Sequence, residues 1–132
     1  MKIYETLLVV SWALFISLGC SPDSGVTRYN VTGQVTYNGV PVPMGEISFD
    51  PLEQGIGGGF APINDGRFDT TIDGRGHLGG EHRVQIVGFK GWIDPSDPDK
   101  GAIPLFTPYE TTVDFSNGTS TMDFEVPSVT ER

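Results

Sequence analysis

The stretch YNVTGQVTYNG, residues 29–39, decides the fold predicted for this chain. Apolar or aromatic residues alternate in it with polar ones. One face of an extended chain would carry Tyr29, Val31, Gly33, Val35 and Tyr37. A period of two with β-branched and aromatic residues is typical of a half-buried β-strand. The strand is predicted to end at the Asn-Gly pair of residues 38–39, which favours the positive φ angles of a tight turn.

The same alternation recurs downstream and predicts further short strands, at residues 46–49, 58–63, 67–72, 82–89, 111–115 and 121–126. The residues expected to point inward include Ile47, Phe49, Val84 and Ile86, and a shared face is expected for Phe68, Thr70 and Ile72. Turns are predicted at residues 64–66 and 117–118, and the two prolines in residues 40–43 exclude a central strand there. No window has sustained helical spacing. We therefore predict an all-β fold, a β-sandwich of about seven strands.

The residues before this domain have the pattern of an export segment. A charged start precedes the apolar run LLVVSWALFISLG, residues 7–19, and Cys20 follows. A spanning helix needs about 20 apolar residues, so the run is short for a permanent anchor. Gly19-Cys20 resembles the lipobox of bacterial lipoproteins, in which the cysteine is acylated and becomes the new N-terminus. Cys20 is the only cysteine and has no disulfide partner in the chain. The alternative is an ordinary signal peptide, cut near Gly19.

These features predict a signal peptide at residues 1–19, the lipidated Cys20 and a tether at 20–28, a sandwich at 29–127 and a tail at 128–132. The expected location is the bacterial cell envelope, with the protein held in a membrane by the lipid on Cys20. Ser21 stands where an aspartate retains some lipoproteins at the inner membrane, which favours the outer membrane or the surface. The net charge of −9 argues against nucleic acid as a partner.

Several short motifs resemble those of carboxypeptidase-regulatory-like domains, which have a transthyretin-like sandwich fold. They are Gly33-Gln34-Val35, Gly39-Val40-Pro41, Gly45-Glu46-Ile47, Asp65-Gly66-Arg67-Phe68 and the GEHRV of residues 80–84. Their order and spacing carry the resemblance, which covers residues 30–127 and extends to small bacterial lipoproteins with this domain. It implies a transthyretin-like or Ig-like sandwich with a non-catalytic accessory role, and it carries over no catalytic residue.

The side chains that could do chemistry form no recognisable site. His77 and His82 are candidates for a general base, but an odd offset along an extended chain predicts that they point to opposite faces. Their spacing does not match a zinc site, so no cofactor is predicted. Asp94, Asp97 and Asp99 offer carboxylates suited to calcium, and the alternative is a solvated acidic loop. We predict that the chain is not an enzyme.

The connection at residues 90–109 is longer than most loops of compact domains and holds the remaining candidates. Trp92, Phe106 and Tyr109 are its aromatic residues, and they are predicted either to bind a partner or to cap the core. The function predicted from the sequence is structural or protein-binding, with an unknown envelope protein or glycan as partner. A carbohydrate- or calcium-binding module is the alternative. The edge of the sheet is the expected contact.

Overall fold

The structure is a computed structural model that describes residues 26–53, 57–91, 96–97 and 101–128. In these ranges it has nine strands and no helix. The strands are β1 (Val31–Tyr37), β2 (Val40–Pro41), β3 (Met44–Pro51), β4 (Gly59–Asn64), β5 (Arg67–Asp69), β6 (Gly80–Phe89), β7 (Tyr109–Phe115), β8 (Ser120–Thr121) and β9 (Phe124–Val126). The predicted all-β class is confirmed. A search of the described residues for a helix able to span a membrane found none.

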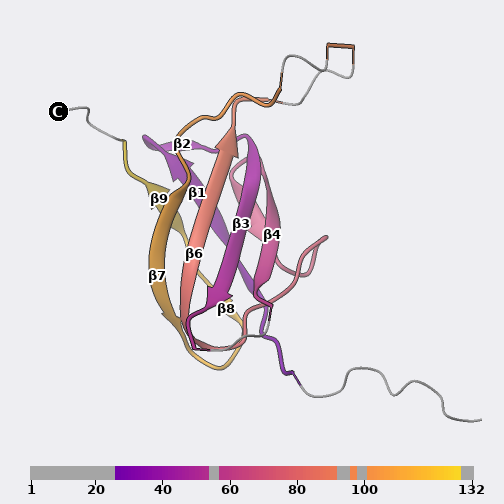
Figure 1. Ribbon diagram of the computed structural model, residues 1–132, viewed down its shortest axis with the longest axis vertical. Helices are drawn as coiled ribbons and strands as arrows, with labels where there is room; N and C mark the ends of the chain where they lie inside the picture. Colours follow the sequence, from indigo (N-terminus) through magenta and orange to yellow (C-terminus); the bar gives the residue numbers. More distant parts are fainter. Residues whose placement is uncertain (1–25, 54–56, 92–95, 98–100, 129–132) are drawn as a thin grey trace, which may run out of the picture.

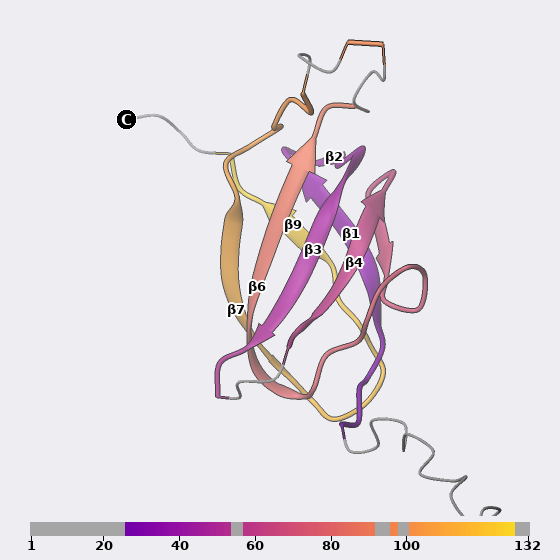
Figure 2. The same cartoon turned by 45° about the vertical axis from the view of Figure 1, so that its right-hand side comes forward.

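The strands form one curled sheet in the order β2-β1-β5-β4-β3-β6-β7. Neighbours along this path are antiparallel, whereas β8 and β9 both pair with β1 in parallel. The curl brings β4, β3, β6 and β7 into one layer, with β1 and β9 behind it (Figures 1 and 2). This arrangement is sandwich-like, because apolar side chains from both layers meet between them.

The core between the layers is built by the alternation that the sequence predicted. Ile47, Phe49, Val84 and Ile86 are all fully buried, as expected. The rest of the core comprises Val31, Val35, Val42, Ala61, Ile63, Phe68, Phe106, Phe115, Phe124 and Val126. Phe49 lies near the centre, with its ring centroid 5.6 Å from that of Phe115 and 6.1 Å from that of Phe68. One continuous core therefore links both layers.

Two of the predicted turns have the backbone that their residues favour. Asn38 and Gly39 have φ angles of 53° and 75°, and Asp65 and Gly66 have φ angles of 50° and 76°. Two successive positive φ angles define the tight turn that matches the twist of a hairpin. Asn-Gly and Asp-Gly are the pairs that adopt it most readily, which is why these two predictions are confirmed.

The predicted strand at residues 67–72 is too long, because β5 ends at Asp69. The Asp69 carboxylate accepts hydrogen bonds from the Thr71 backbone N–H, at 2.8 Å, and from the Thr71 hydroxyl, at 2.6 Å. A side chain that bonds the backbone two residues ahead forms a turn in place of a strand. Thr70 stays buried, but Ile72 leaves the core face and is 60% exposed, so its predicted position was wrong.

The last predicted strand, residues 121–126, is divided into β8 and β9 without a change of register against β1. At the interruption, the carbonyl of Met122 crosses directly over Gly33, where a Cβ would lie 1.8 Å from its oxygen. The Asp123 carboxylate accepts the Gln34 backbone N–H at 3.0 Å in place of a ladder bond. Gly33 is therefore required by a close backbone approach at this point.

Candidate functional site

Several residues singled out from the sequence lie outside the described part of the chain. These are Cys20, Trp92, Asp94 and Asp99. Asp97 is described, but its two companions in the calcium hypothesis are not. Among the residues that the structure describes, no group of three or more His, Cys, Asp or Glu side chains could hold a metal ion. The lipid anchor and the calcium loop therefore stay predictions.

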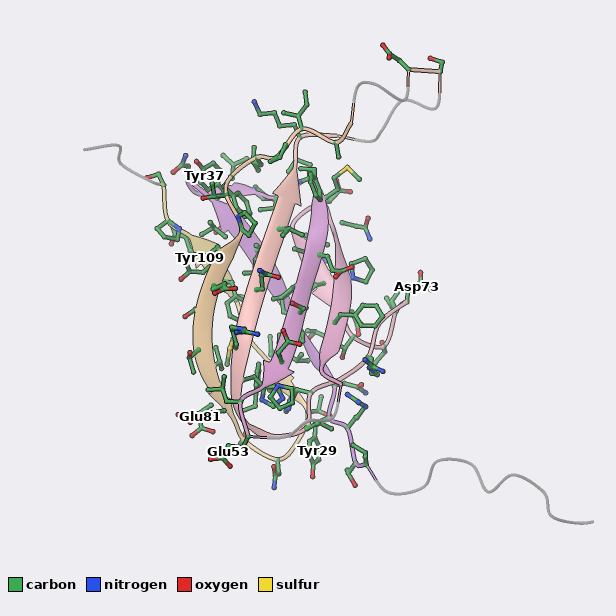
Figure 3. The ribbon with its side chains drawn as sticks, in the orientation of Figure 1. Tyr29, Tyr37, Glu53, Asp73, Glu81 and Tyr109 are labelled. Carbon is green, nitrogen blue, oxygen red and sulfur yellow. The ribbon has the colours of Figure 1, made fainter. Side chains whose placement is uncertain are left out.

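Phe106 and Tyr109 cap one end of the core. Phe106 is 9% exposed, and its ring centroid lies 5.1 Å from that of Tyr37. Tyr109 is half-buried and packs against the same cluster. Figure 3 shows Tyr37 and Tyr109 at the end of the sandwich opposite Tyr29. Of the two roles that the sequence left open for these aromatic residues, this packing favours the cap for Phe106.

The prediction that His77 and His82 point to opposite faces was wrong. Both rings are fully buried, with 5.8 Å between their centroids. Each packs on Phe115, stacked at 4.2 Å for His77 and edge-on at 5.4 Å for His82. The chain between them is not extended, because Gly79 and Gly80 have φ angles of 79° and 80° and reverse it. The odd number of positions from His77 to His82 therefore does not predict the directions of their side chains.

A backbone hydrogen bond to His77 indicates which ring nitrogen carries the proton of its neutral form. The backbone N–H of Gly79 donates to Nδ1 of His77 at 3.0 Å, so the proton of the neutral ring is on Nε2. The geometry gives this buried Nε2 no hydrogen-bond partner in the described ranges, although the Gly118 backbone interacts with the ring and favours its protonated form. Burial and then the nearby His82 lower the pKa of His77, while the backbone of Gly118 acts in the opposite direction. The net effect favours the neutral form of His77.

The chemistry open to this pair is limited by its burial. A general base has to come within hydrogen-bond distance of the proton that it removes. Both imidazoles lie under Phe115 with no exposed surface. Nε2 of His82 accepts the Leu78 N–H at 3.3 Å, and its Nδ1 lies 2.9 Å from the Gly80 carbonyl oxygen. These contacts fit a structural role, which is to close the end of the sandwich that contains Tyr29.

Strand β7 is an edge of the sheet, since β6 is its only partner among the described strands. The directions in which the N–H and C=O groups of β7 point can be derived from the hydrogen bonds of β6. The Glu81 carbonyl accepts a hydrogen bond from the N–H of Leu52, which follows β3. The Gly88 carbonyl accepts one from the N–H of Leu105, which lies shortly before β7. Even-numbered residues of β6 therefore bond toward β7. It follows from the register that Glu110, Thr112 and Asp114 direct their N–H and C=O groups away from the sheet.

A second feature is a groove of about 600 Å³ on the outer face of β4, β5, β1 and β8, which we call the outer groove. Its lining includes Gln34, Pro62, Arg67, Asp69, Ile72 and Asp123. No motif in the sequence indicates this groove. Its polar residues are those that alternation places on the solvent face of a strand, and only the pairing of distant strands brings them together.

No protein-family model matches the chain, and no curated protein matches its sequence. The resemblance to carboxypeptidase-regulatory-like domains therefore stays a prediction. The function has to be argued from the open edge at β7, the outer groove and the export pattern.

Proposed function

We propose that this chain is an exported, lipid-anchored β-sandwich of the bacterial cell envelope, without catalysis, that binds a protein partner by strand addition at β7. The observation that carries the proposal is the outer edge of β7, which no described strand covers. The strand has seven residues, and three of them direct backbone donors and acceptors outward. An extended segment of a partner could continue the ladder there.

The charge of this edge favours a basic partner strand. Glu110 and Asp114 are exposed on β7, and Asp114 stands directly opposite Glu81 of β6. Like charges at opposed positions of a sheet destabilise it. A lysine or arginine on an added strand would relieve this repulsion. Gln85 donates to the Glu110 carboxylate at 3.2 Å and already orients one of the acidic side chains.

The proposed anchor gives the domain a definite orientation. The described chain begins at Val26, and Tyr29 bonds to His77 through both backbone groups, at 2.8 and 3.0 Å. A tether from Cys20 would thus join the sandwich at this end. Figure 3 places Tyr37 and Tyr109 at the far end. The strand β7 runs between the two ends and would stand upright on the membrane, open along its side.

Site-specific crosslinking in cells tests the edge. A photoreactive amino acid at position 110 or 114 is expected to capture the same protein, whereas one at Ser48, on the outer face of the central β3, should not. Thr112→Pro removes one outward N–H and should abolish capture, since proline is tolerated at an edge but cannot donate. Thr112→Ala is the matched control and should retain it. Capture that is unchanged in Thr112→Pro, or no capture at positions 110 and 114, would refute the proposal.

The anchor has its own test, which is the mass of the mature N-terminal peptide from the membrane fraction. The expected result is an acylated Cys20, and Cys20→Ser should release the protein from the membrane. An unmodified N-terminus would contradict the anchor and leave the edge-binding proposal to be decided by the crosslinking.

A further inference from the structure

The outer groove is independent of the proposed edge contact. It lies over β1, β4, β5 and β8, whereas β7 is at the far end of the strand order. Its volume, about 600 Å³, falls within the usual range for sites that take small molecules. An inference about this groove therefore goes beyond the proposed function.

Two rows of polar side chains cross the floor of the groove. In the first row, Gln34 pairs with Arg67 on one side and bonds through its backbone to Asp123 on the other. In the second row, Thr32 pairs with Asp69 and Thr121, and the two threonine hydroxyl oxygens are 3.4 Å apart. Strand pairing fixes the spacing of these rows, so donors and acceptors are held in a regular array.

Much of this array has unused hydrogen-bonding capacity. Within the described part of the chain, the Arg67 guanidinium and the Gln34 side-chain amide form no hydrogen bond or ion pair. Asp123 uses Oδ1 for the Gln34 backbone, and Asp69 uses Oδ1 for Thr71, which leaves each carboxylate a second oxygen. The bonds from Thr71 lower the pKa of Asp69, its hydroxyl more than its N–H, and keep Asp69 an acceptor.

Apolar surface borders the polar floor. Ile72 is 60% exposed and lines the groove together with Pro62. The segment that carries Ile72 is fixed at Thr70, whose hydroxyl accepts the Val31 N–H at 3.0 Å and whose own N–H donates to the Val31 carbonyl at 3.1 Å. The groove is thus preformed, with an aliphatic wall beside an array of donors and acceptors.

We propose that the outer groove binds a neutral oligosaccharide. Each sugar hydroxyl both donates and accepts, which matches amide, guanidinium and carboxylate groups side by side. The C–H face of a sugar ring can pack on Ile72 and Pro62. Two carboxylates outweigh the one guanidinium among the charged lining residues Arg67, Asp69 and Asp123, so an anionic ligand such as a nucleotide is disfavoured. The guanidinium in turn disfavours a simple cation.

The test is titration of the isotope-labelled protein with four neutral tetrasaccharides, chitotetraose, cellotetraose, mannotetraose and maltotetraose, at millimolar concentration. At least one is expected to shift the backbone amide signals of residues 32–34, 67–72 and 121–123 selectively. Arg67→Ala and Gln34→Ala should weaken this binding roughly tenfold, because each removes hydrogen bonds to the ligand. Both side chains are exposed on the outer face, so the variants should fold.

Two controls separate this site from the rest of the molecule. Arg83→Ala removes an exposed arginine from β6, outside the groove lining, and should leave binding unchanged. Thr112→Pro should also leave it unchanged, since β7 is not involved. The proposal is overturned if no tetrasaccharide shifts these amides, if Arg67→Ala binds as tightly as the native chain, or if only a charged peptide fills the groove.

Discussion

The edge formed by β8 and β9, which pair only with β1 among the described strands, and the edge formed by β7 are built in opposite ways. At one edge, β8 and β9 have two and three residues and are separated by the Met122 crossing over Gly33. At the other, β7 has seven residues in one unbroken strand. Short, interrupted edge strands pair poorly with a strand from another chain, whereas a long, continuous edge strand pairs readily. The comparison suggests that the first edge is protected by its backbone geometry and the second is left available.

Both edges carry exposed acidic side chains. The Asp123 carboxylate at the interrupted edge is exposed, and its Oδ1 accepts the Gln34 N–H. The acidic side chains of β7, Glu110 and Asp114, are exposed. Acidic residues on an open strand deter other acidic or apolar strands but not basic ones. The edges therefore differ chiefly in the length and continuity of their strands, which the following experiments test.

The largest effect is expected for Gly33→Ala, which tests the interrupted edge. A Cβ at this position would lie 1.8 Å from the carbonyl oxygen of Met122, so the backbone has to move. The loss should be about 3 kcal/mol or more of the free energy of unfolding, measured in urea. Gly91→Ala is the control, since its Cβ would meet no atom of the described residues within 4 Å, and it should be nearly neutral. Equal stability of the two variants would contradict the crossing.

The next-largest effect is expected for protonation of His77, which packs on Phe115, the last residue of β7. Burial and the nearby His82 lower the pKa of His77 in the folded state, so the unfolded chain takes up its proton first. The contribution of neutral His77 to the free energy of unfolding should be fully present above the pKa of the unfolded state, about 6.5, and should be lost as the pH falls toward the lower pKa of the folded state.

Urea unfolding of the native chain and of His77→Phe over this pH range measures that effect. The variant keeps an aromatic ring on Phe115 but cannot titrate, so its stability should depend less on pH. An equal loss in both proteins would show that other groups cause the acid sensitivity.

A smaller effect is expected for Asp123→Ala, which removes the carboxylate that replaces a ladder bond at the interruption. The Gln34 N–H would lose its partner at 3.0 Å, and the stability should fall by about 1 kcal/mol. Asp123→Asn keeps an oxygen acceptor and should lie close to the native protein. Loss of the same amount in both variants would show that the charge, and not the hydrogen bond, matters.

The smallest effect on stability is expected for Thr112→Pro, which tests the open edge. Its N–H points away from β6, so stability should change by less than about 1 kcal/mol. The neighbouring change, Thr111→Pro, removes a bond to β6 and should cost about 3 kcal/mol. Thermal unfolding of both variants distinguishes them, and the reverse order would invalidate the assigned backbone directions.

The fold was predictable because its information is local. Alternation identified Ile47 and Val84 as core residues, and Asn38-Gly39 marked a turn whose φ angles confirm it. The errors arose where a side chain or a glycine redirected the chain. Asp69 ended β5 by bonding to Thr71. Such competition between a side chain and the ladder depends on three-dimensional geometry, so periodicity does not reveal it.

The candidate sites were less predictable, because pairing between distant segments creates them. The outer groove joins Arg67 to Gln34 and Asp123, and the free edge of β7 depends on which strand lies beside it. The histidine pair was misjudged because Gly79 and Gly80 reverse the chain between its members. Contact through a sheet edge stays a prediction, and the sequence did not indicate which strand forms an edge.

The parallel pairing of β1 with β8 and β9 has a consequence for how the protein folds. Gln34 and Asp123 are 89 residues apart in the sequence. The backbone groups on one side of β1 therefore have no pairing strand until β8 and β9 have been synthesised. Contacts of such long range form slowly. During synthesis the chain should therefore remain incompletely folded until β8 and β9 have emerged. Pulse-labelled hydrogen exchange during refolding would report this as late protection of the β8 and β9 amides, and early protection there would exclude it.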